Sequence, residues 1–292
     1  MKKNFLISLS LLSLLSLNAF AFDYNSYCAP TDNLKGSFLG NVMSLTGANL
    51  ASRNVAKGQI KKAIKKATGA NPKITLTSYF GHNFFDGEFS SLKGSIEEFQ
   101  YKGMYYSNLK FNSLCPYNKV RYQDNALVFD ENFLMDFEAE ISQEDLNKYI
   151  KSSNYQKTLE KLEKNEIFSK LFKVQESEIK ISENKLQFNY KLTPFPNASR
   201  HLEFVKSFIK PINLAFGAGL KIENSKIELC DLDFNSSKIS YDYILPFLNM
   251  TNPTNFEVKI DKNNNAQVEI QDVKIQDKKI ILKGILLAQK KD

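Results

Sequence analysis

The segment FLMDFEAEISQEDLNKYIKSS, Phe133 to Ser153, changes its hydrophobic period halfway along. Apolar residues occupy every second position from Phe133 to Ile141, and acidic residues lie between them from Asp136 onward. Beyond Ser142, the apolar residues follow a helical spacing. A period of two predicts a strand with one apolar face, and a period of 3.6 predicts a helix. The segment therefore predicts a one-sided strand that runs into a helix. The apolar face of that strand must be covered by the protein's own side chains or by something bound from outside.

Similar alternating segments recur along the chain and are separated by short polar turns. KISENKL (180–186), KIENSKI (221–227) and KIQDKKI (274–280) each predict a strand, a turn and a second strand, and residues 130–132 predict the turn of another hairpin. The apolar parity slips at residues 271–272, which predicts a β-bulge or a tight turn there. With 23 Phe and 13 Tyr, the composition also favours sheet. We expect an α+β fold, in which a long, curved antiparallel meander wraps over a few helices.

The N-terminal residues MKKNFLISLSLLSLLSLNAFA have the features of a secretory signal peptide. Lys2 and Lys3 precede an apolar run, and Ala19-Phe20-Ala21 fits the cleavage pattern. An uncleaved anchor is the alternative, although the run is short for a span of about 20 residues. We predict a signal peptide at residues 1–21, a single domain at residues 22–292, and an extracytoplasmic location in the periplasm or cell envelope. Loss of the two lysines would lower the net charge from +7 to +5, which is too weak to indicate a nucleic-acid partner.

Three cysteines, Cys28, Cys115 and Cys230, follow the predicted cleavage site. Export permits a disulfide, but three cysteines allow three single pairings. Cys28 and Cys115 both lie in loop-like contexts, NSYCAP and NSLCPY, whereas Cys230 in KIELCDLDF resembles a small strand residue. The sequence favours the pair Cys28–Cys115, and three free thiols are the alternative.

Residue types that carry catalysis are sparse in recognisable arrangements. His82 and His201 are the only histidines, and neither has a companion at metal or catalytic spacing. The sequence holds no nucleophile elbow, zinc-protease, phosphate-loop or C-x-x-C motif. Asp136, Glu138 and Glu140 would share the solvent face of the alternating strand. We therefore predict a protein that is not an enzyme and needs no cofactor or metal. Carboxylate-based glycoside hydrolysis is the weaker alternative.

The segment NVAKGQIKKAIKKATGANP, residues 54–72, predicts a helix that ends near Gly69 and Pro72. Ile60 and Ile64 share its apolar face, and lysines flank them. A basic amphipathic helix can lie on an anionic membrane surface; an ordinary helix with a solvated basic side is the alternative. The candidate docking residues are Lys57, Lys61, Lys62, Lys65 and Lys66.

Several blocks of the sequence resemble one bacterial family. They are residues 87–114, with Gly94 and Leu109, residues 139–164, residues 174–192 and residues 268–284. Together the blocks resemble the LmeA-like phospholipid-binding proteins, which are extracytoplasmic. The resemblance implies export, phospholipid binding and an elongated, curved sheet with an apolar interior, similar to tubular lipid-binding folds. The family has no catalytic motif to transfer to this chain.

The resemblance supplies one interpretation of the apolar strand face. Removing an acyl chain from a bilayer costs ~0.8 kcal/mol per CH2, so a carrier must offer an apolar enclosure. We expect an exported protein that binds or shuttles phospholipid or another acyl-chain lipid in a groove. The alternative is a cell-envelope structural or interaction module with a filled core and no ligand. The candidate lining residues are Leu127, Phe129, Phe133, Met135, Phe137 and Ile141.

Overall fold

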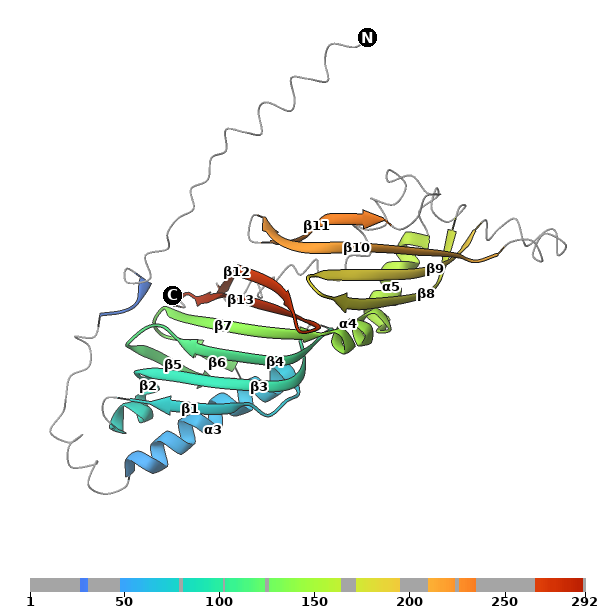
Figure 1. Cartoon of the computed structure of the whole chain (residues 1–292). Helices are drawn as coiled ribbons and strands as arrows, with labels where there is room; N and C mark the ends of the chain where they lie inside the picture. Colours follow the sequence, from blue (N-terminus) through green and yellow to red (C-terminus); the bar gives the residue numbers. More distant parts are fainter. Residues whose placement is uncertain are drawn as a thin grey trace, which may run out of the picture.

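A computed structural model of the chain shows a mostly antiparallel β-sheet protein with a few helices (Figure 1), as the predicted α+β class requires. The predicted signal peptide and His201 lie outside the described residues. The described residues are 27–30, 48–78, 81–101, 103–123, 126–163, 172–194, 210–223, 226–234 and 266–290.

The largest sheet has six antiparallel strands, and strands from both ends of the chain meet in it (Figure 1). The predicted one-sided strand, β7, lies near its centre, between β4 and β13. In spatial order the strands are β1 (Lys73–Thr77), β3 (Ser91–Tyr101), β4 (Met104–Ser113), β7 (Phe133–Ser142), β13 (Lys279–Ala288) and β12 (Ala266–Gln276).

A second, four-stranded sheet lies beside the first in Figure 1 and is drawn from yellow to orange. Its spatial order is β11 (Lys226–Phe234), β10 (Ile212–Glu223), β9 (Lys185–Pro194) and β8 (Phe172–Ser182). A small third sheet has the order β2 (Glu88–Phe89), β5 (Asn118–Gln123) and β6 (Ala126–Phe129). The described part of the chain contains the helices α3 (Ala48–Thr68), the 3₁₀ helix η2 (Gly81–Asp86), α4 (Gln143–Ile150) and α5 (Ser153–Glu163).

Most of the local predictions are confirmed. The three repeated segments form the hairpins β8–β9, β10–β11 and β12–β13. The register of the last shifts between Ile270 and Asp272, as a β-bulge, where the sequence predicts a bulge or a tight turn. Ser142 caps α4 as predicted. Its side chain accepts from the Asp145 backbone N–H, and the Asp145 carboxylate accepts from the Ser142 backbone N–H. The cap fixes the point at which the strand period changes to the helix period.

The predicted hairpin about residues 130–132 is wrong. β6 pairs with β5 in the small sheet, whereas β7 pairs with β4 and β13 in the large one. The chain leaves the small sheet at Asp130, whose backbone N–H donates to the Lys119 carbonyl and whose carboxylate binds Arg121. These bonds hold β6 against β5. Phe129 and Phe133 therefore contact each other from two different sheets, and are not cross-strand neighbours in one hairpin.

A disulfide joins Cys28 to Cys115, the pair that the sequence favours, and Cys230 is a free thiol in β11. The bonded cysteines pack against Leu134 and Leu287, on the face of the large sheet opposite to Phe133 and Met135. The disulfide therefore ties the described N-terminal segment to the outer face of the sheet.

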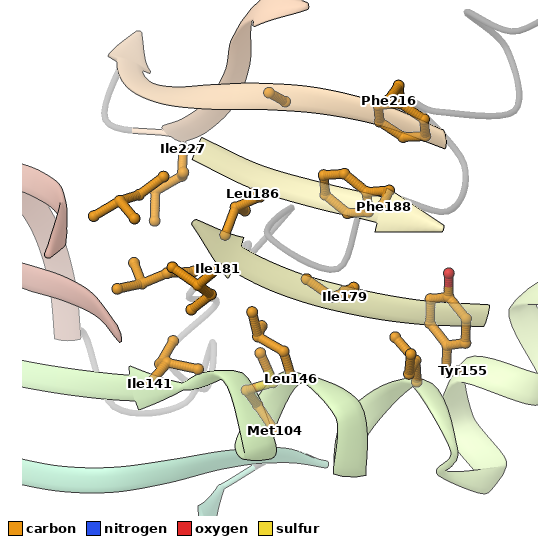
Figure 2. Close-up of a cluster of buried hydrophobic side chains, with 14 of the residues drawn as sticks. Met104, Ile141, Leu146, Tyr155, Ile179, Ile181, Leu186, Phe188, Phe216 and Ile227 are labelled. Carbon is orange, nitrogen blue, oxygen red and sulfur yellow. The ribbon is translucent and has the colours of Figure 1, made fainter. Parts of the chain in front are cut away.

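The inner face of the large sheet is covered in two different ways. At one end, α4 and the four-stranded sheet pack directly on it and form a filled core, here called the packed cluster (Figure 2). Ile141, Leu146 and Leu186 are completely buried in this cluster. At the other end, α3 and the small sheet lie over the same face. The second arrangement leaves space.

Candidate functional site

A cavity of about 340 Å³ lies between the inner face of the large sheet and its cover of α3 and the small sheet. We call it the apolar cavity. It is partly open to solvent, and none of the 23 described residues that line it is charged. The lining consists of Ile60, Ile64, Ala67 and Thr68 from α3; Phe89, Val120, Leu127 and Phe129 from the small sheet; and Leu92, Ile96, Phe99, Tyr101, Tyr106, Leu109, Phe111, Phe133, Met135, Phe137, Ala139, Val268, Ile270, Leu282 and Leu286 from the large sheet.

Two glycines explain why the aromatic side chains of the large sheet do not fill this cavity. Gly94, Phe111, Phe137 and Gly284 occupy one row across four neighbouring strands. A Cβ on Gly94 would lie 2.4 Å from Cζ of Phe111, and a Cβ on Gly284 would lie 2.8 Å from Cζ of Phe137. Each ring therefore lies over a glycine, in the space that a side chain would fill. Because the rings lie along the sheet, they leave the volume above them open.

Aromatic contacts brace the walls. Phe133 stacks on Phe129 with 5.1 Å between ring centroids and meets Phe89 edge-on at 6.5 Å, which joins the large sheet to both outer strands of the small one. On the neighbouring strands, Phe99 stacks on Tyr106 at 4.9 Å. Such pairs contribute about 0.5–1.5 kcal/mol beyond their burial. The cavity is thus bounded by rings that hold one another in place.

The few polar atoms in the lining have limited bonding capacity for a ligand. The Thr68 hydroxyl donates to the Ile64 carbonyl at 2.8 Å and accepts from the Ala70 N–H at 3.3 Å. Burial, with a smaller contribution from Tyr101, raises the pKa of Tyr106 to about 12. A raised tyrosine pKa means that the site disfavours charge. The cavity is therefore suited to a neutral, apolar occupant.

Five of the six predicted lining residues meet at this cavity: Leu127, Phe129, Phe133, Met135 and Phe137. The sixth, Ile141, does not line it, because α4 and the four-stranded sheet enclose that end of β7 in the packed cluster.

Sequence reasoning missed most of the other walls, although a signal was present. Leu92, Gly94 and Ile96 alternate along β3, and the buried positions then change parity at Glu98, which has a positive φ of 47°, so that Phe99 is also buried. The same parity argument that found the bulge at residues 271–272 would have placed β3 on this face.

A second, smaller cavity of about 230 Å³ adjoins the apolar cavity, and we call it the small cavity. The two share Ile60, Phe89, Val120 and Leu127 as walls. Unlike the lining of the apolar cavity, that of the small cavity includes a charged residue, Arg121, and a polar residue, Gln59. The Arg121 side chain follows Val120 on β5 and therefore lies on the other face of the small sheet, where it pairs with Asp130. Its other lining residues are Ala56, Leu76, Phe84 and Gly87.

A basic depression of about 540 Å³ lies on the other side of α3, near the edge strand β1. Lys57 and Lys61 line it, whereas Lys62, Lys65 and Lys66 are exposed elsewhere on the helix. The structure adds three lysines that the sequence did not connect to the helix, and no described carboxylate lines the depression. These three are Lys73, Lys93 and Lys110.

The acidic residues of β7 lie on the opposite face, away from the apolar cavity. Glu138 pairs with Lys283 at 2.9 Å and Lys110 at 3.5 Å, and Glu140 pairs with Lys279 at 2.6 Å. Hydrogen bonds from these lysines hold the pKa of both carboxyl groups below the ordinary value. Ionised, paired carboxylates on a solvated face are not arranged as an acid and base around a substrate.

Comparison with protein-family models, curated proteins and solved structures finds no significant match to this chain. The resemblance to the LmeA-like family therefore stays a prediction. In the part of the chain that the structure describes, no helix is long and apolar enough to cross a membrane, and no three metal-binding side chains gather.

Proposed function

We propose that the protein binds an acyl-chain lipid, such as a phospholipid, in the apolar cavity, and that it sequesters or shuttles this lipid without acting on it chemically. The observation that carries the proposal is the lining: 23 residues enclose 340 Å³, and none of those described is charged. Large apolar side chains such as Met135, Phe137 and Leu109 are only partly buried there. A ligand would complete their burial, and thioethers and flat rings adapt to chains of different shape.

The size of the cavity supports an alkyl chain. A dry apolar cavity of about 150 Å³ holds one benzene ring, so 340 Å³ has room for roughly a dozen carbon atoms. At ~0.8 kcal/mol per CH2, burying that many methylenes contributes on the order of 10 kcal/mol. This would offset much of the free energy that the same methylenes of the acyl chain lose when they leave a bilayer.

The proposal places the protein outside the cytoplasm. The disulfide Cys28–Cys115 is of the kind that persists outside the reducing cytoplasm. The curved sheet with a hollow end is also the arrangement expected of a tubular lipid-binding architecture. The predicted signal peptide would provide export.

Native mass spectrometry tests the proposal against the alternative of a structural module with a filled core. Protein purified from envelope extracts should carry a mass corresponding to an acyl lipid. Met135→Lys should remove that mass because it places a charge in the cavity. Asp136→Lys is the matched control, since it adds the same residue to the opposite face of the same strand. A folded Met135→Lys variant with unchanged lipid occupancy would rule out this binding site.

We further propose that the basic depression docks the protein on an anionic membrane surface. A lysine near such a surface contributes roughly 1 kcal/mol. Lys57, Lys61 and Lys93 have no ion pair among the described residues, so their charges are available to lipid phosphates. Co-sedimentation with phosphatidylglycerol vesicles should fall more for a Lys57→Gln/Lys61→Gln variant than for Lys62→Gln/Lys66→Gln. Equal losses would show that general charge, and not the depression, controls binding.

A further inference from the structure

The apolar cavity has a closed end at the packed cluster. Ala139 of β7 and Leu282 of β13 are cross-strand partners that line the cavity and also belong to the packed cluster. The next inward-facing residues on these two strands, Ile141 and Ile280, are partners as well. Both are completely buried, and neither lines the cavity. The cavity therefore ends at the pair formed by Ala139 and Leu282.

The protein behind this closed end is filled and held in place. Leu146 of α4 and Ile181 of β8 pack in the same cluster as Ile141 (Figure 2). The amide of Asn147, also on α4, accepts from the Ile179 N–H at 3.0 Å and donates to the Ile179 carbonyl at 2.7 Å. These two bonds attach the helix to β8, the edge strand of the four-stranded sheet. Because a close-packed region resists the insertion of even one methylene, a ligand cannot extend into it.

A small residue leaves room at the closed end. In the row that crosses β4, β7 and β13, Ala139 lies between Leu109 and Leu282. Its neighbours on the inner face of β7, Phe137 and Ile141, are much larger. A longer side chain at position 139 would therefore fill the last part of the cavity, and alanine keeps it open.

The volume favours one alkyl chain over two. The apolar cavity of about 340 Å³ has room for roughly a dozen carbon atoms on the benzene scale, which is less than one complete tail of an ordinary phospholipid. The lining residue Ala67 is exposed, so the cavity opens at that end of α3 and the rest of a longer chain can extend outward there. A charged head has no partner among the described lining residues, and its burial without one would be costly.

We propose that Ala139 sets the length of alkyl chain that the apolar cavity accepts. The ligand inserts one unbranched chain with its methyl end first, the chain stops against the packed cluster beside Ala139, and the head stays outside the cavity. The protein then selects its ligand by chain length and not by head group. This inference rests on the proposed function and specifies which part of the lipid is recognised.

Alkyl maltosides are suitable probes, because their sugar head is too large and too polar to enter the cavity. The octyl, decyl, dodecyl and tetradecyl compounds are titrated by calorimetry into the protein without its predicted signal peptide. Each added carbon should tighten binding roughly fourfold as far as the dodecyl compound. Binding should then level off, since further carbons lie outside the cavity. An affinity that is independent of chain length, or that still rises at the tetradecyl compound, would contradict the proposed limit.

A larger residue at the closed end should shorten the accepted chain. Ala139→Val adds two carbons, so the affinity for dodecyl maltoside should fall about tenfold while that for octyl maltoside stays the same. Ala218→Val is the matched control, because Ala218 is fully buried in the packed cluster on β10 and does not line the cavity. A folded Ala139→Val protein that binds both compounds as the wild type does, or loses both equally, would overturn the inference.

A smaller residue in the same wall should have the opposite effect. Leu282→Ala removes three carbons beside Ala139, so tetradecyl maltoside should bind about tenfold more tightly than dodecyl maltoside in this variant. This second variant keeps the test decisive if Ala139→Val does not fold. Equal affinities for the two compounds would show that this wall does not limit the chain.

Competition with a phospholipid separates failure of this inference from failure of the proposed function. Dodecyl maltoside should displace a bound diacyl phosphatidylglycerol, since both would place one chain in the cavity. If the phospholipid binds and no maltoside displaces it, or if no limit of chain length is found, the role of Ala139 is wrong and lipid binding stands. If no acyl compound binds the wild-type protein, the proposed function itself is wrong.

Discussion

The packed cluster and the apolar cavity occupy the two ends of one sheet face, and strand β7 contributes to both. At one end, Ile141 is fully buried beside Leu146 and Leu186. At the other end, Met135 and Phe137 remain partly exposed beneath α3. The side chains are equally apolar, so hydrophobicity does not explain the difference. The difference comes from the elements that cover the sheet at each end.

Two local features produce the contrast. In the packed cluster, α4 begins at the Ser142 cap and places Leu146 between the two sheets (Figure 2). Ile150 of the same helix is buried in the cluster too. Over the cavity, α3 is 21 residues long, yet Ile60 is its one buried hydrophobic residue among those described. The rings below it lie over Gly94 and Gly284 instead of pointing upward. A filled core and a hollow thus arise from the same strand pattern.

The largest expected effect comes from deleting equivalent side chains at the two ends of β7. Ile141→Ala should lower the free energy of unfolding by about 3–4 kcal/mol, because it leaves a void in a close-packed region. Met135→Ala should cost about 1 kcal/mol, since that side chain already borders open space. Urea denaturation of the two variants measures the difference. Equal losses would mean that the cavity end is packed as tightly as the other.

Gly94→Ala should convert part of the hollow into filled space. The new methyl group would meet the Phe111 ring at 2.4 Å and the Lys73 carbonyl oxygen at 2.8 Å, so the ring must turn toward the cavity. We expect a stability loss of about 1–3 kcal/mol, as for overpacked cores. Binding of a twelve-carbon ligand should fall by at least tenfold. Gly58→Ala is the control, because its Cβ would meet no atom within 4 Å. Unchanged ligand affinity in Gly94→Ala would show that the ring position does not limit the cavity.

Part of this contrast was predictable from the sequence. Period-two runs and polar turns predict the hairpins of the second half of the chain, and the capping box predicts the strand-to-helix change at Ser142. These are local signals, because turn chemistry and side-chain periodicity are set by neighbouring residues. The five cavity-lining residues from 127 to 137 could be identified for the same reason.

The division between filled and hollow was not predictable. Ile141 continues the alternation of Phe133, Met135 and Phe137 without a break, so nothing local separates it from them. It is buried because β8 and β9, which come later in the chain, fold back over that end of β7. Likewise, Asp130 directs β6 to another sheet through its bonds to Arg121 and Lys119, and the sequence 130–132 alone reads as a tight turn. Long-range packing decides both outcomes.

A smaller effect is expected from the ionisation of Tyr106, in the cavity wall, on the unfolding free energy at high pH. The pKa of Tyr106, raised to about 12 by burial, lies above its ordinary value of 10.0. The folded protein therefore retains a proton that the unfolded chain loses. The resulting stabilisation is complete below pH 10 and is lost as pH rises toward 12. Tyr106→Phe should reduce the alkaline slope of the unfolding free energy by up to about one proton.

Tyr105→Phe provides the control for this measurement, because Tyr105 precedes Tyr106 on β4 and its side chain lies on the other face. It should leave the slope closer to that of the wild type. Bound alkyl chain should displace water from Tyr106 and delay its ionisation further, as seen by ultraviolet titration of tyrosinate. If the chain has no effect on the alkaline titration, Tyr106 does not contact the ligand.

The smallest effect is expected on the outer face of the same strand. Glu138→Gln breaks ion pairs to Lys283 and Lys110, both of whose side chains are more than half exposed. Exposed pairs of this kind contribute about 0–1 kcal/mol. The folded-state pKa of Glu138 is lowered, so its contribution is present above pH 4.5 and disappears as pH falls through the folded-state value. Equilibrium unfolding of wild type and variant near neutrality and in acid should therefore differ slightly in the first case and not in the second. Lipid occupancy should be the same in the wild type and the variant, because the sheet separates Glu138 from the cavity. A large loss of occupancy would show that the two faces of the sheet are coupled. The acidic residues of β7 could then not be treated as a solvated surface.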